Sequence, residues 1–522
     1  MKILVQLLIF VLWTTAAQSQ PNIAWQRNLG GSSADIAWCV HLTRDGGVVA
    51  AGSTGSDDLD VVGFHGNVDA WLIKLDSNGI VEWQRCSGGS GVEEIRSIRQ
   101  TMDNGYVAIG YTTSSDGDVA VPIGISAIWV IRFDALGNIL WERTYGGSGG
   151  QKGWRIEETS NGDFNILAES TSTDGPMTDN HSENMGMDIW FARLAANGDL
   201  LWSKCLGGTG ADSARDMVVL ASGDILLVGI TNSFDGDIIG YHEGGPSRPP
   251  DTWLVKVDQS GEVLWQLCLG GSGRDTGQGI TVGSDGKIYI ASNSLSTDGD
   301  ITAPLGNWDY WIARVSADGV LEDQRSFGGS SSDQLAAIAG GMDNSLYITG
   351  GSPSIDGDVG NPQGGSDVWT IKLDLELNLI WERSFGGSSG DSGWGIKVAP
   401  NGSVALAGTS SSVDGDLTGN NGLNDLWVVK LESEFVGIND GVALFNLTIY
   451  PNPATTELHI GLIGTTSRQL EVVDVTGRIV ITQAITSGTT SVGLSIVQLA
   501  QGTYSVRLVG DGQYYSDRFI KY

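Results

Sequence analysis

The chain of 522 residues contains 76 glycines and 18 tryptophans but only 17% charged residues, a composition that favours a β-rich fold with many tight turns over long solvated helices. Its formal net charge at pH 7 is −32, and the segment from residue 442 onward contributes almost nothing to that charge. This excess of negative charge in the body argues against nucleic acid or an anionic membrane as the partner, because like charges repel.

The first 19 residues have the pattern of a secretory signal peptide. Lys2 precedes the apolar run Ile3–Trp13, which is too short to cross a bilayer. Small and polar residues follow, and the small-residue rule places the cleavage after Ala17 or Ser19. We therefore expect residues 1–19 to be removed on export and the mature chain to contain no membrane span.

A repeat of about 58 residues fills most of the remaining chain. One series of equivalent positions precedes a Gly-Gly-Ser or Gly-Gly-Thr turn and holds Trp25, Trp83, Trp141, Trp202, Trp265, Asp323 and Trp381. A second series with the same spacing holds Trp71, Trp129, Trp190, Trp253, Trp311, Trp369 and Trp427, which we expect to be buried between the repeats. The two series define seven copies of one structural unit.

Each copy reads as four short strands separated by turn residues. In the first copy these strands are Ile36–Thr43, Val48–Ser53, Ala70–Leu75 and Ile80–Arg85. Four strands per copy, repeated seven times, is the blade pattern of a β-propeller. The sequence therefore predicts an all-β fold whose body, residues 20–431, is a seven-bladed β-propeller with about 58 residues per blade.

The two ends of the array are complementary. A lone fourth-type strand, Ala24–Leu29, precedes the first copy, and the seventh copy ends with its third strand, Leu426–Leu431. Pairing these two strands would complete the last blade and remove two exposed sheet edges. We predict that the N-terminal strand closes the propeller in this way.

The repeat resembles the beta-propeller repeat family of bacterial surface proteins over about residues 24–432. The first copy matches through Leu29-Gly30-Gly31-Ser32, Asp35, Asp45-Gly46, Gly52-Ser53-Thr54 and Asp69-Ala70-Trp71-Leu72-Ile73-Lys74. The resemblance implies a propeller fold and no single activity.

A different pattern begins after a linker at residues 432–445. Residues 446–522 consist of short alternating strands with Gly and Pro turns, which predicts a small Ig-like β-sandwich. This segment resembles the type A C-terminal sorting domain of type IX secretion substrates in Bacteroidota. The sorting motifs that carry the resemblance include Tyr450, Pro451, Asn452, Pro453, Gly477, Arg478, Gly502, Tyr504 and Lys521.

The resemblance implies that residues 446–522 address the chain to the type IX machinery. It implies passage through the periplasm to the extracellular space or the outer cell surface, usual removal of the sorting domain, and either release or anchoring of the product.

Acidic residues recur in three series. The first follows the Gly-Gly turn and holds Asp35, Glu93, Gln151, Asp212, Asp275, Asp333 and Asp391, so the third copy is neutral. The second precedes the buried-type Trp and holds Asp69, Ala127, Asp188, Asp251, Asp309, Asp367 and Asp425, so the second copy is neutral. The third is an Asp-x-Asp pair in the loop between the second and third strands.

Two interpretations of the Asp-x-Asp pairs compete. Carboxylates beside glycine turns can bind calcium, the one cofactor that the sequence brings into question. The candidate ligands are Asp116, Asp118, Asp298, Asp300, Asp356, Asp358, Asp414 and Asp416. Alternatively, each Asp stabilises its own turn by accepting backbone hydrogen bonds, and repetition in nearly every copy favours this structural role.

The loops between the second and third strands of copies 3 and 4 are longer than the others, and insertions on one face of a repeat protein commonly carry specificity. Their candidate binding residues are His181, Tyr241, His242 and Arg248. His65, His181 and His242 could also form a three-histidine metal site, although loop histidines of no special role are commoner. The four cysteines are best explained as small buried residues rather than disulfides.

The sequence favours a non-catalytic binding scaffold that presents its loop face to a glycan or a surface protein. An extracellular polysaccharide hydrolase or lyase is the alternative, and a structural surface-layer component is the third. An enzyme should show a central pocket with two non-repeated carboxylates, whereas a binding protein should show aromatic side chains instead.

Overall fold

The computed structural model describes residues 20–121, 124–181, 186–242, 248–433, 448–450, 454–461, 468–474, 478–486, 489, 491–510 and 513–521. Every regular element in these residues is a β-strand, which confirms the all-β prediction. Within the same residues, nothing forms a helix that is long and apolar enough to cross a membrane. The predicted signal peptide and most of the predicted linker lie outside the described residues.

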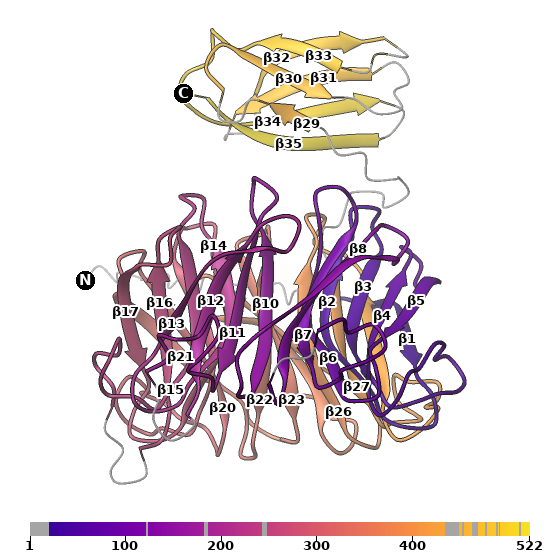
Figure 1. Cartoon of the computed structure of the whole chain (residues 1–522). Coiled ribbons are helices and arrows are strands. Elements are labelled where there is room, and N and C mark those ends of the chain that lie inside the picture. Colours follow the sequence, from indigo (N-terminus) through magenta and orange to yellow (C-terminus); the bar gives the residue numbers. More distant parts are fainter. Residues whose placement is uncertain are drawn as a thin grey trace, which may run out of the picture. The chain divides into compact units, whose positions relative to one another are not determined.

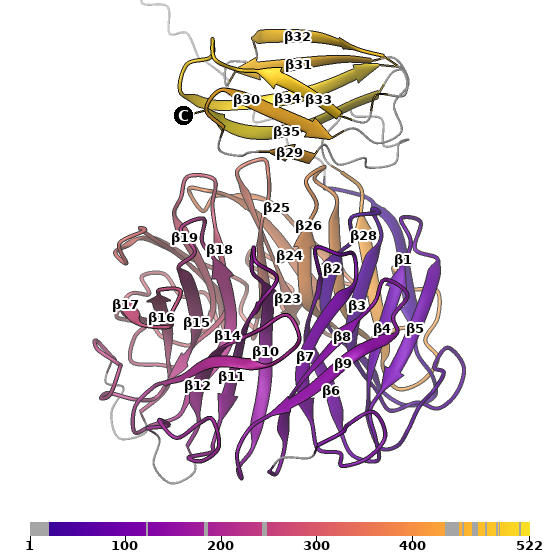
Figure 2. The ribbon, with the colours of Figure 1, turned by 45° about the horizontal axis from the view of Figure 1, so that its top comes forward.

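The chain divides into two compact units, a larger one formed almost entirely by residues up to Glu434 and a smaller one formed by Phe435–Tyr522. The larger unit contains seven four-stranded antiparallel sheets, which follow one another in chain order (Figures 1 and 2). We number these sheets 1 to 7 in that order.

The strands of the first four sheets fall in the predicted repeats. Sheet 1 consists of β2 (Asp35–Leu42), β3 (Val48–Thr54), β4 (Asp69–Leu75) and β5 (Val81–Ser87). Sheet 2 consists of β6 (Glu93–Gln100), β7 (Tyr106–Thr112), β8 (Ala127–Phe133) and β9 (Ile139–Tyr145). Sheet 3 consists of β10 (Gln151–Glu158), β11 (Phe164–Ser170), β12 (Asp188–Leu194) and β13 (Leu200–Leu206). Sheet 4 consists of β14 (Asp212–Val219), β15 (Ile225–Thr231), β16 (Asp251–Val257) and β17 (Val263–Leu269).

The remaining three sheets keep this plan. Sheet 5 consists of β18 (Asp275–Val282), β19 (Ile288–Ser294), β20 (Asp309–Val315) and β21 (Leu321–Phe327). Sheet 6 consists of β22 (Gln334–Gly340), β23 (Ser345–Ser352), β24 (Asp367–Asp374) and β25 (Leu379–Phe385). Sheet 7 consists of β26 (Asp391–Val398), β27 (Val404–Ser410), β28 (Asp425–Leu431) and β1 (Ile23–Leu29).

The N-terminal strand pairs with the last repeat, as predicted. Strand β1 runs antiparallel to β28, with Gln26 opposite Val429 and Leu29 opposite Leu426. The Gln26 side chain also accepts a 2.8 Å hydrogen bond from the indole Nε1 of Trp427. Sheet 7 thereby obtains its fourth strand from the other end of the array.

The hydrophobic cores lie between neighbouring sheets. The third-strand tryptophans are at most 2% exposed, which confirms that they are packing anchors. Trp311 of sheet 5, for example, shares a cluster with Leu226 and Leu254 of sheet 4. Burial of such a ring removes a large apolar area from water, so each sheet is stabilised mainly by the sheet beside it.

All four cysteines are buried free thiols. Cys86, Cys205 and Cys268 lie opposite the anchor tryptophan of their own sheet on the adjacent strand. They serve as small packing residues beside a large ring.

The first strands β2, β6, β10, β14, β18, β22 and β26 contact one another in turn, and β26 contacts β2. The seven first strands therefore surround one central space. The larger unit is β-propeller-like, with the first strand of each sheet nearest this centre.

The smaller unit contains two antiparallel sheets. One comprises β29 (Thr448–Tyr450), β30 (Glu457–Gly461) and β33 (Ser491–Ser495), and the other comprises β31 (Arg468–Asp474), β32 (Ile479–Ile485), β34 (Gly502–Gly510) and β35 (Gln513–Lys521). Both sheets contribute to one buried cluster, in which Leu458 and Ile460 meet Val472, Val506 and Phe519.

The described sorting-motif residues lie on or next to these strands. Tyr450 is in β29, Arg478 directly precedes β32, Gly502 and Tyr504 are in β34, and Lys521 is in β35. Tyr504 stacks on Phe519 with ring centroids 5.6 Å apart. The motif residues Pro451, Asn452, Pro453 and Gly477 lie outside the described residues.

Deletion of residues 20–30 should lower the free energy of unfolding of the larger unit by several kcal/mol, because sheet 7 loses its outer strand and exposes the edge of β28. Urea denaturation followed by tryptophan fluorescence measures this unit alone, since no tryptophan lies beyond Trp427. A synthetic peptide of the deleted residues should restore part of the loss. An unchanged urea midpoint would contradict the role of β1.

Candidate ligand pocket at the centre of the repeats

Each first strand contains a β-bulge at the same position. The pairing of β2 with β3, for example, steps from Ala37 to Cys39 and leaves Trp38 without a partner. The unpaired residues in the seven sheets are Trp38, Arg96, Trp154, Arg215, Gln278, Ala336 and Trp394. A bulge bends the strand and re-aims the extra side chain, and here seven such side chains come from strands that share one centre.

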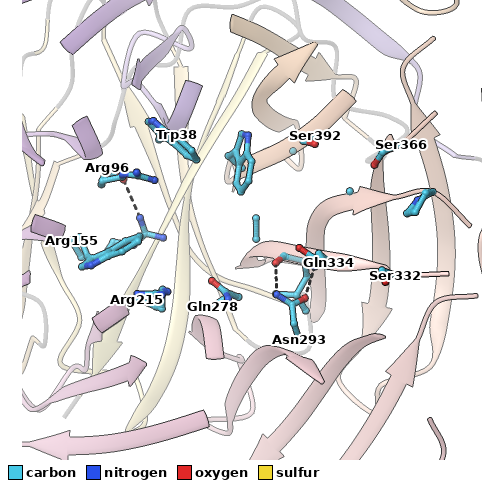
Figure 3. A pocket seen from close by; sticks show the side chains of 17 residues that line it. Trp38, Arg96, Arg155, Arg215, Gln278, Asn293, Ser332, Gln334, Ser366 and Ser392 are labelled. Atoms are coloured by element: carbon cyan, nitrogen blue, oxygen red, sulfur yellow. Dashed lines mark hydrogen bonds between the residues drawn. The ribbon is translucent and has the colours of Figure 1, made fainter. Parts of the chain in front are cut away.

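All seven bulge residues line a single pocket of about 500 Å³ (Figure 3). This volume lies within the range that small-molecule sites occupy. Arg155, Asn293, Gln334 and three serines, Ser332, Ser366 and Ser392, complete the polar part of its wall. Three arginines but no Asp, Glu, His, Lys or Tyr are among the described residues that line it.

Tryptophans and arginines alternate along one side of the pocket. The rings of Trp394 and Trp38 have centroids 4.8 Å apart. The Arg96 guanidinium carbon lies 3.8 Å from the centroid of Trp38 and 5.3 Å from that of Trp154. Arg215 lies 4.3 Å from the centroid of Trp154. We call this series, Trp394, Trp38, Arg96, Trp154 and Arg215, the Trp–Arg ladder.

The ladder spans the consecutive sheets 7, 1, 2, 3 and 4. Cation–π contacts stabilise a guanidinium over an aromatic ring. Some N–H groups of these arginines are also engaged with the protein, since Arg96 Nη2 pairs with Glu94 and Arg215 Nη1 donates to the Ser213 hydroxyl and the Ala214 carbonyl. The ladder thus fixes the orientation of two positive charges.

The cavity exists because the bulge residues of sheets 5 and 6 are small or flexible. Ala336 stands where sheets 1, 3 and 7 have tryptophan, and Gly351 and Gly393 lie in the same part of the wall. Asn293 supports this side by bridging sheets 5 and 6, since its amide exchanges hydrogen bonds of 2.7 and 3.1 Å with the backbone of Leu335.

Each arginine that lines the pocket forms an ion pair with a carboxylate. Arg155 lies 2.6 Å from Asp216, Arg96 lies 2.5 Å from Glu94, and Arg215 lies 3.6 Å from Glu169. The last pairing is loose, and burial lowers the pKa of Arg215 below its ordinary value. An anion bound beside a buried and loosely paired guanidinium stabilises its charged form.

Buried donors add to the positive character of the ladder. The Nε of Arg96 and the indole Nε1 atoms of Trp38 and Trp154 are buried without a hydrogen-bond partner among the described residues. Such unpaired donors are costly. The ladder therefore favours an acceptor over a donor.

A second layer of charge lies three residues further along the first strands. Arg99 pairs with Glu157 at 2.6 Å. Burial, with Arg99 nearby, lowers the pKa of Lys397 to about 8. These residues do not line the pocket and form part of the central packing beyond it.

The predicted calcium ligands are engaged with backbone amides. Asp298 accepts a 2.7 Å hydrogen bond from the Ser272 amide, and Asp300 accepts one of 3.0 Å from the Gly270 amide. Asp116 and Asp118, Asp356 and Asp358, and Asp414 and Asp416 make the equivalent bonds in their own sheets. These bonds lower the pKa of Asp116, Asp298, Asp356 and Asp414.

These carboxylates thus tie two loops together, which differs from the prediction that each Asp stabilises its own turn. Within the described part of the chain, no three His, Cys, Asp or Glu side chains are arranged to hold a metal ion. Calcium binding stays an untested prediction.

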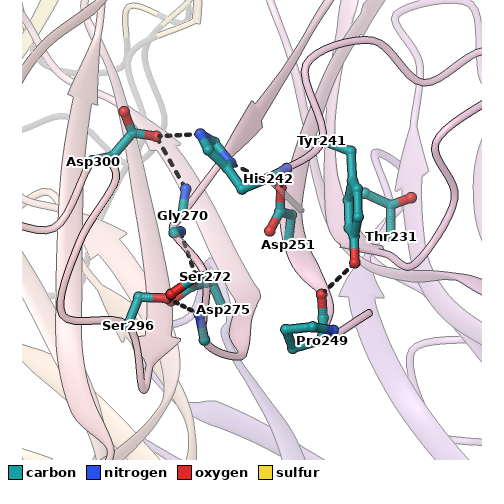
Figure 4. A network of polar contacts seen from close by, with 12 residues as sticks. Thr231, Tyr241, His242, Pro249, Asp251, Gly270, Ser272, Asp275, Ser296 and Asp300 are labelled. Carbon is teal, nitrogen blue, oxygen red and sulfur yellow. Dashed lines mark hydrogen bonds and ion pairs between the residues drawn. The ribbon is translucent and has the colours of Figure 1, made fainter. Parts of the chain in front are cut away.

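The predicted loop-face residues lie away from the central pocket. His242 contacts Asp251 at 2.9 Å and approaches Asp300 of the next sheet at 3.9 Å (Figure 4). The Tyr241 hydroxyl donates a 2.8 Å hydrogen bond to the Pro249 carbonyl. Arg248 lies over the Phe234 ring at 4.0 Å.

His181 belongs to the preceding sheet and lies 3.1 Å from Asp188, while His65 lies 2.7 Å from Asp69. Each of the three histidines therefore contacts the aspartate of its own sheet rather than the other histidines. Tyr241, His242 and Arg248 share one loop, and His181 stands apart from them in sequence and sheet. Their role in binding stays a prediction.

Comparison with known proteins identifies the C-terminal unit. Residues 448–522 match the family described as "Secretion system C-terminal sorting domain". The chain is a type IX secretion substrate. Its sorting domain directs this substrate to the outer cell surface or the extracellular space.

The secretion substrate is 30% identical over 238 residues to the regulatory protein FlaEY of Caulobacter vibrioides. The aligned region covers 42% of this chain and 24% of that protein. The chain thus spans about a quarter of that relative.

Two solved structures are similar at low identity. A protein of unknown function from Dyadobacter fermentans has a TM-score of 0.43 at 12% identity and covers 79% of this chain and 99% of its own. The Pan2 WD40 domain of Neurospora crassa has a TM-score of 0.43 at 11% identity, with coverages of 77% and 95%. Likeness at this level says nothing about activity.

The sequence contained a signal for the pocket that periodicity alone did not reveal. The position three residues after the first-strand acid varies between Trp, Arg, Gln and Ala, whereas the position two residues later is always Val, Ile or Met. A position whose residue type changes from copy to copy in an otherwise regular repeat is a candidate for a function specific to single copies. Its direction toward the centre depends on the bulge, which the sequence pattern does not display.

Paired carboxyl groups occupy most junctions between sheets. A Cβ atom added to Gly30 would lie 2.6 Å from both Asp35 of sheet 1 and Asp425 of sheet 7, so both carboxyls border this glycine. The equivalent pairs are Asp69 and Glu93, Asp188 and Asp212, Asp251 and Asp275, Asp309 and Asp333, and Asp367 and Asp391. At the remaining junction both members are neutral, Ala127 and Gln151.

The third-strand members of these pairs are poorly solvated. Asp425 is fully buried, and its Oδ1 has no partner among the described residues. Burial, with Asp35 and Asp60 nearby, raises its pKa to about 6. Burial likewise raises the pKa of Asp188 to about 7, with a contribution from Asp212. The folded secretion substrate therefore binds protons at these junctions more tightly than the unfolded chain.

Asp425→Asn should raise the free energy of unfolding at pH 7.5 by about 1–2 kcal/mol. Because folding raises the pKa of Asp425 from 3.8 to about 6, the stability supplied by the protonated form is present below about pH 4 and is lost as the pH rises to about 6. The uncharged amide removes this loss, and Ala127 is a natural uncharged residue at the equivalent position. Urea denaturation at pH 4 and 7.5 measures the difference.

The gain should be much smaller at pH 4, because folded Asp425 is then protonated and the unfolded residue, with a pKa of 3.8, is only about half ionised. Asp57→Asn, at an exposed loop position, is the control and should change stability little at either pH. A loss of stability in Asp425→Asn at pH 7.5 would contradict the raised pKa.

Proposed function

We propose that this type IX secretion substrate is a non-catalytic binding protein whose central pocket takes an anionic ligand. In this proposal residues 1–19 are a signal peptide, residues 20–431 form a seven-bladed β-propeller closed by β1, and residues 432–445 link it to an Ig-like sorting domain at 446–522. The propeller binds the ligand, and the sorting domain is the export signal.

The Trp–Arg ladder is the observation that carries the proposal. The chain has a net charge of −32, yet the described residues that line its central pocket include three arginines and no carboxylate. The acidic surface of the protein repels other acidic proteins. A positively charged pocket within that surface attracts small anions locally. Aromatic rings and fixed guanidinium groups together supply both contact area and specificity.

The pocket chemistry favours binding over catalysis. Glycosidases generally cleave with a pair of carboxyl groups, and general bases in other mechanisms are His, Lys, Tyr or carboxylate side chains. None of these residue types is among the described residues that line the pocket. A structural surface-layer component would not need bulge residues of four different types around one cavity.

Ala336→Trp should abolish ligand binding without unfolding the protein. The indole would fill the cavity, and tryptophan already stands at the equivalent bulge in sheets 1, 3 and 7. A glycan array with acidic and neutral members, probed with the purified wild-type and variant proteins, measures the effect. Urea denaturation of both proteins verifies that the fold is retained.

The wild-type protein should retain acidic members of the array, and the variant should retain none. Retention of the same members by both proteins would place binding outside the central pocket. Retention of neutral members only by the wild type would contradict the anionic ligand. His242→Ala tests the loop face separately and should leave the array pattern unchanged.

Deletion of residues 513–522 should leave the propeller folded but held in the periplasm. Strand β35 pairs with β34 from Gly510 and Gln513 to Gly502 and Lys521, and Phe519 is part of the core of the smaller unit. Loss of β35 should unfold the sorting domain and so remove the export signal. Cell fractionation in a host with a type IX system, with the full chain as control, measures the location.

Delivery of the truncated chain to the medium or the cell surface would contradict the role of β35 in sorting. Periplasmic chain with native tryptophan fluorescence is the expected result, because every tryptophan after the signal segment lies in the larger unit.

A further inference from the structure

The central pocket has two chemically different sides. Figure 3 shows Trp38, Arg96, Arg155 and Arg215 on one side and Ser332, Ser366, Ser392 and Gln334 on the other. The first side carries the positive charge, and the second is neutral and rich in hydroxyl and amide groups. A ligand that fills the pocket must therefore satisfy both kinds of wall.

The arginine side fits an anionic group. Arg96 lies against the rings of Trp38 and Trp154, and Arg215 lies over the ring of Trp154. A planar fork of N–H donors matches a carboxylate or a sulfate, with which arginine forms strong charge-assisted hydrogen bonds.

The neutral side fits hydroxyl groups. The side chains of Ser332, Gln334, Ser366 and Ser392 make no hydrogen bond to other described residues, and hydroxyl and amide groups can both donate and accept. A ligand that carried only anionic groups would leave this wall unused. Sugar hydroxyls, which also donate and accept, satisfy it.

Trp394 stands between the two sides. Its ring is 37% exposed, although it packs against Trp38. An exposed indole face beside hydroxyl-bearing residues provides an apolar platform for the C–H face of a sugar ring. Ser392, two residues earlier on the same strand, belongs to the neutral wall.

We infer that the ligand of the central pocket is an acidic oligosaccharide, with its anionic group on Arg96 and Arg215, a sugar ring on Trp394 and its hydroxyls toward Ser332, Gln334 and Ser366. This inference rests on the proposed function and adds the chemical class of the ligand. A uronic acid and a sulfated sugar are the two sources of the same chemistry.

Isothermal titration calorimetry of the purified full-length chain against four probes tests the inference. Trigalacturonate supplies sugar and carboxylate, and its methyl ester supplies the same sugar without charge. A sulfated galactose trisaccharide supplies sugar and sulfate, and tricarballylate supplies carboxylates without a sugar. We expect one of the acidic sugars to bind at least tenfold more tightly than both the methyl ester and tricarballylate.

Variants test the placement of the ligand. Arg96→Gln and Arg215→Gln should each weaken the acidic sugar about tenfold, because each removes a charge-assisted bond. Glutamine occupies the equivalent bulge in sheet 5, so folding should be retained. Arg143→Gln, on the outer strand β9, removes the same charge elsewhere and should leave the affinity unchanged.

Ser332→Ala combined with Ser366→Ala should weaken both acidic sugars and leave any weak binding of tricarballylate unchanged. Equal weakening by Arg143→Gln and Arg96→Gln would overturn the placement of the anionic group, since it would show an effect of net charge alone.

The four probes separate failure of this inference from failure of the proposed function. Tricarballylate binding as tightly as the acidic sugars would overturn the sugar assignment and leave the anionic pocket standing. Equal binding of trigalacturonate and its methyl ester would overturn both. Absence of binding by all four probes would overturn the assignment to acidic sugars.

Discussion

Contact between neighbouring first strands is the constraint on which the pocket depends. These strands belong to seven separate sheets, and each sheet buries its anchor tryptophan against the sheet that precedes it around the centre. Packing at the sheet interfaces therefore fixes how closely the first strands approach one another. The bulges act within that frame, because an extra residue in a strand that faces the centre has its side chain directed into the central space.

The repeat separates residues that hold the fold from residues that define the site. The acids of the Gly-Gly and Asp-x-Asp loops recur because they bind backbone amides, for instance Asp298 with Ser272. The bulge position tolerates Trp, Arg, Gln or Ala because its side chain projects into space rather than into a core. One copy can therefore change its contribution to the pocket without loss of its sheet, as Ala336 illustrates.

The distribution of charge follows the same division. Many acidic residues lie in the loops of the body, whereas the arginines that line the pocket lie at the centre and pair with Glu94, Asp216 and Glu169. An acidic exterior keeps an exported protein soluble. In the proposed function, the arginines of the pocket attract the anionic ligand electrostatically. The sorting domain has its own hydrophobic core and a nearly neutral sequence, so the sorting signal and the proposed binding pocket belong to different units.

The sequence by itself determined the repeat, the four strands of each copy, the pairing of β1 with β28 and the sorting domain. These features depend on local patterns: the spacing of the tryptophans, the turn residues, and motifs such as Arg478 and Tyr504. It also indicated the buried state of Trp71 and its equivalents, because an aromatic residue at the same place in every copy must meet the same surroundings.

Only the tertiary structure decided which residues form the pocket. Trp38, Arg96, Trp154 and Arg215 lie about 58 residues apart in sequence, and nothing local to any of them shows that they meet. The sequence pointed instead to the loops of His181 and His242, because insertions are visible in a linear alignment of repeats. A side chain's direction at a bulge depends on the register between two strands, and the meeting of seven such side chains depends on the packing of seven sheets. Both are properties of the folded chain, since they arise from contacts between residues that are distant in sequence.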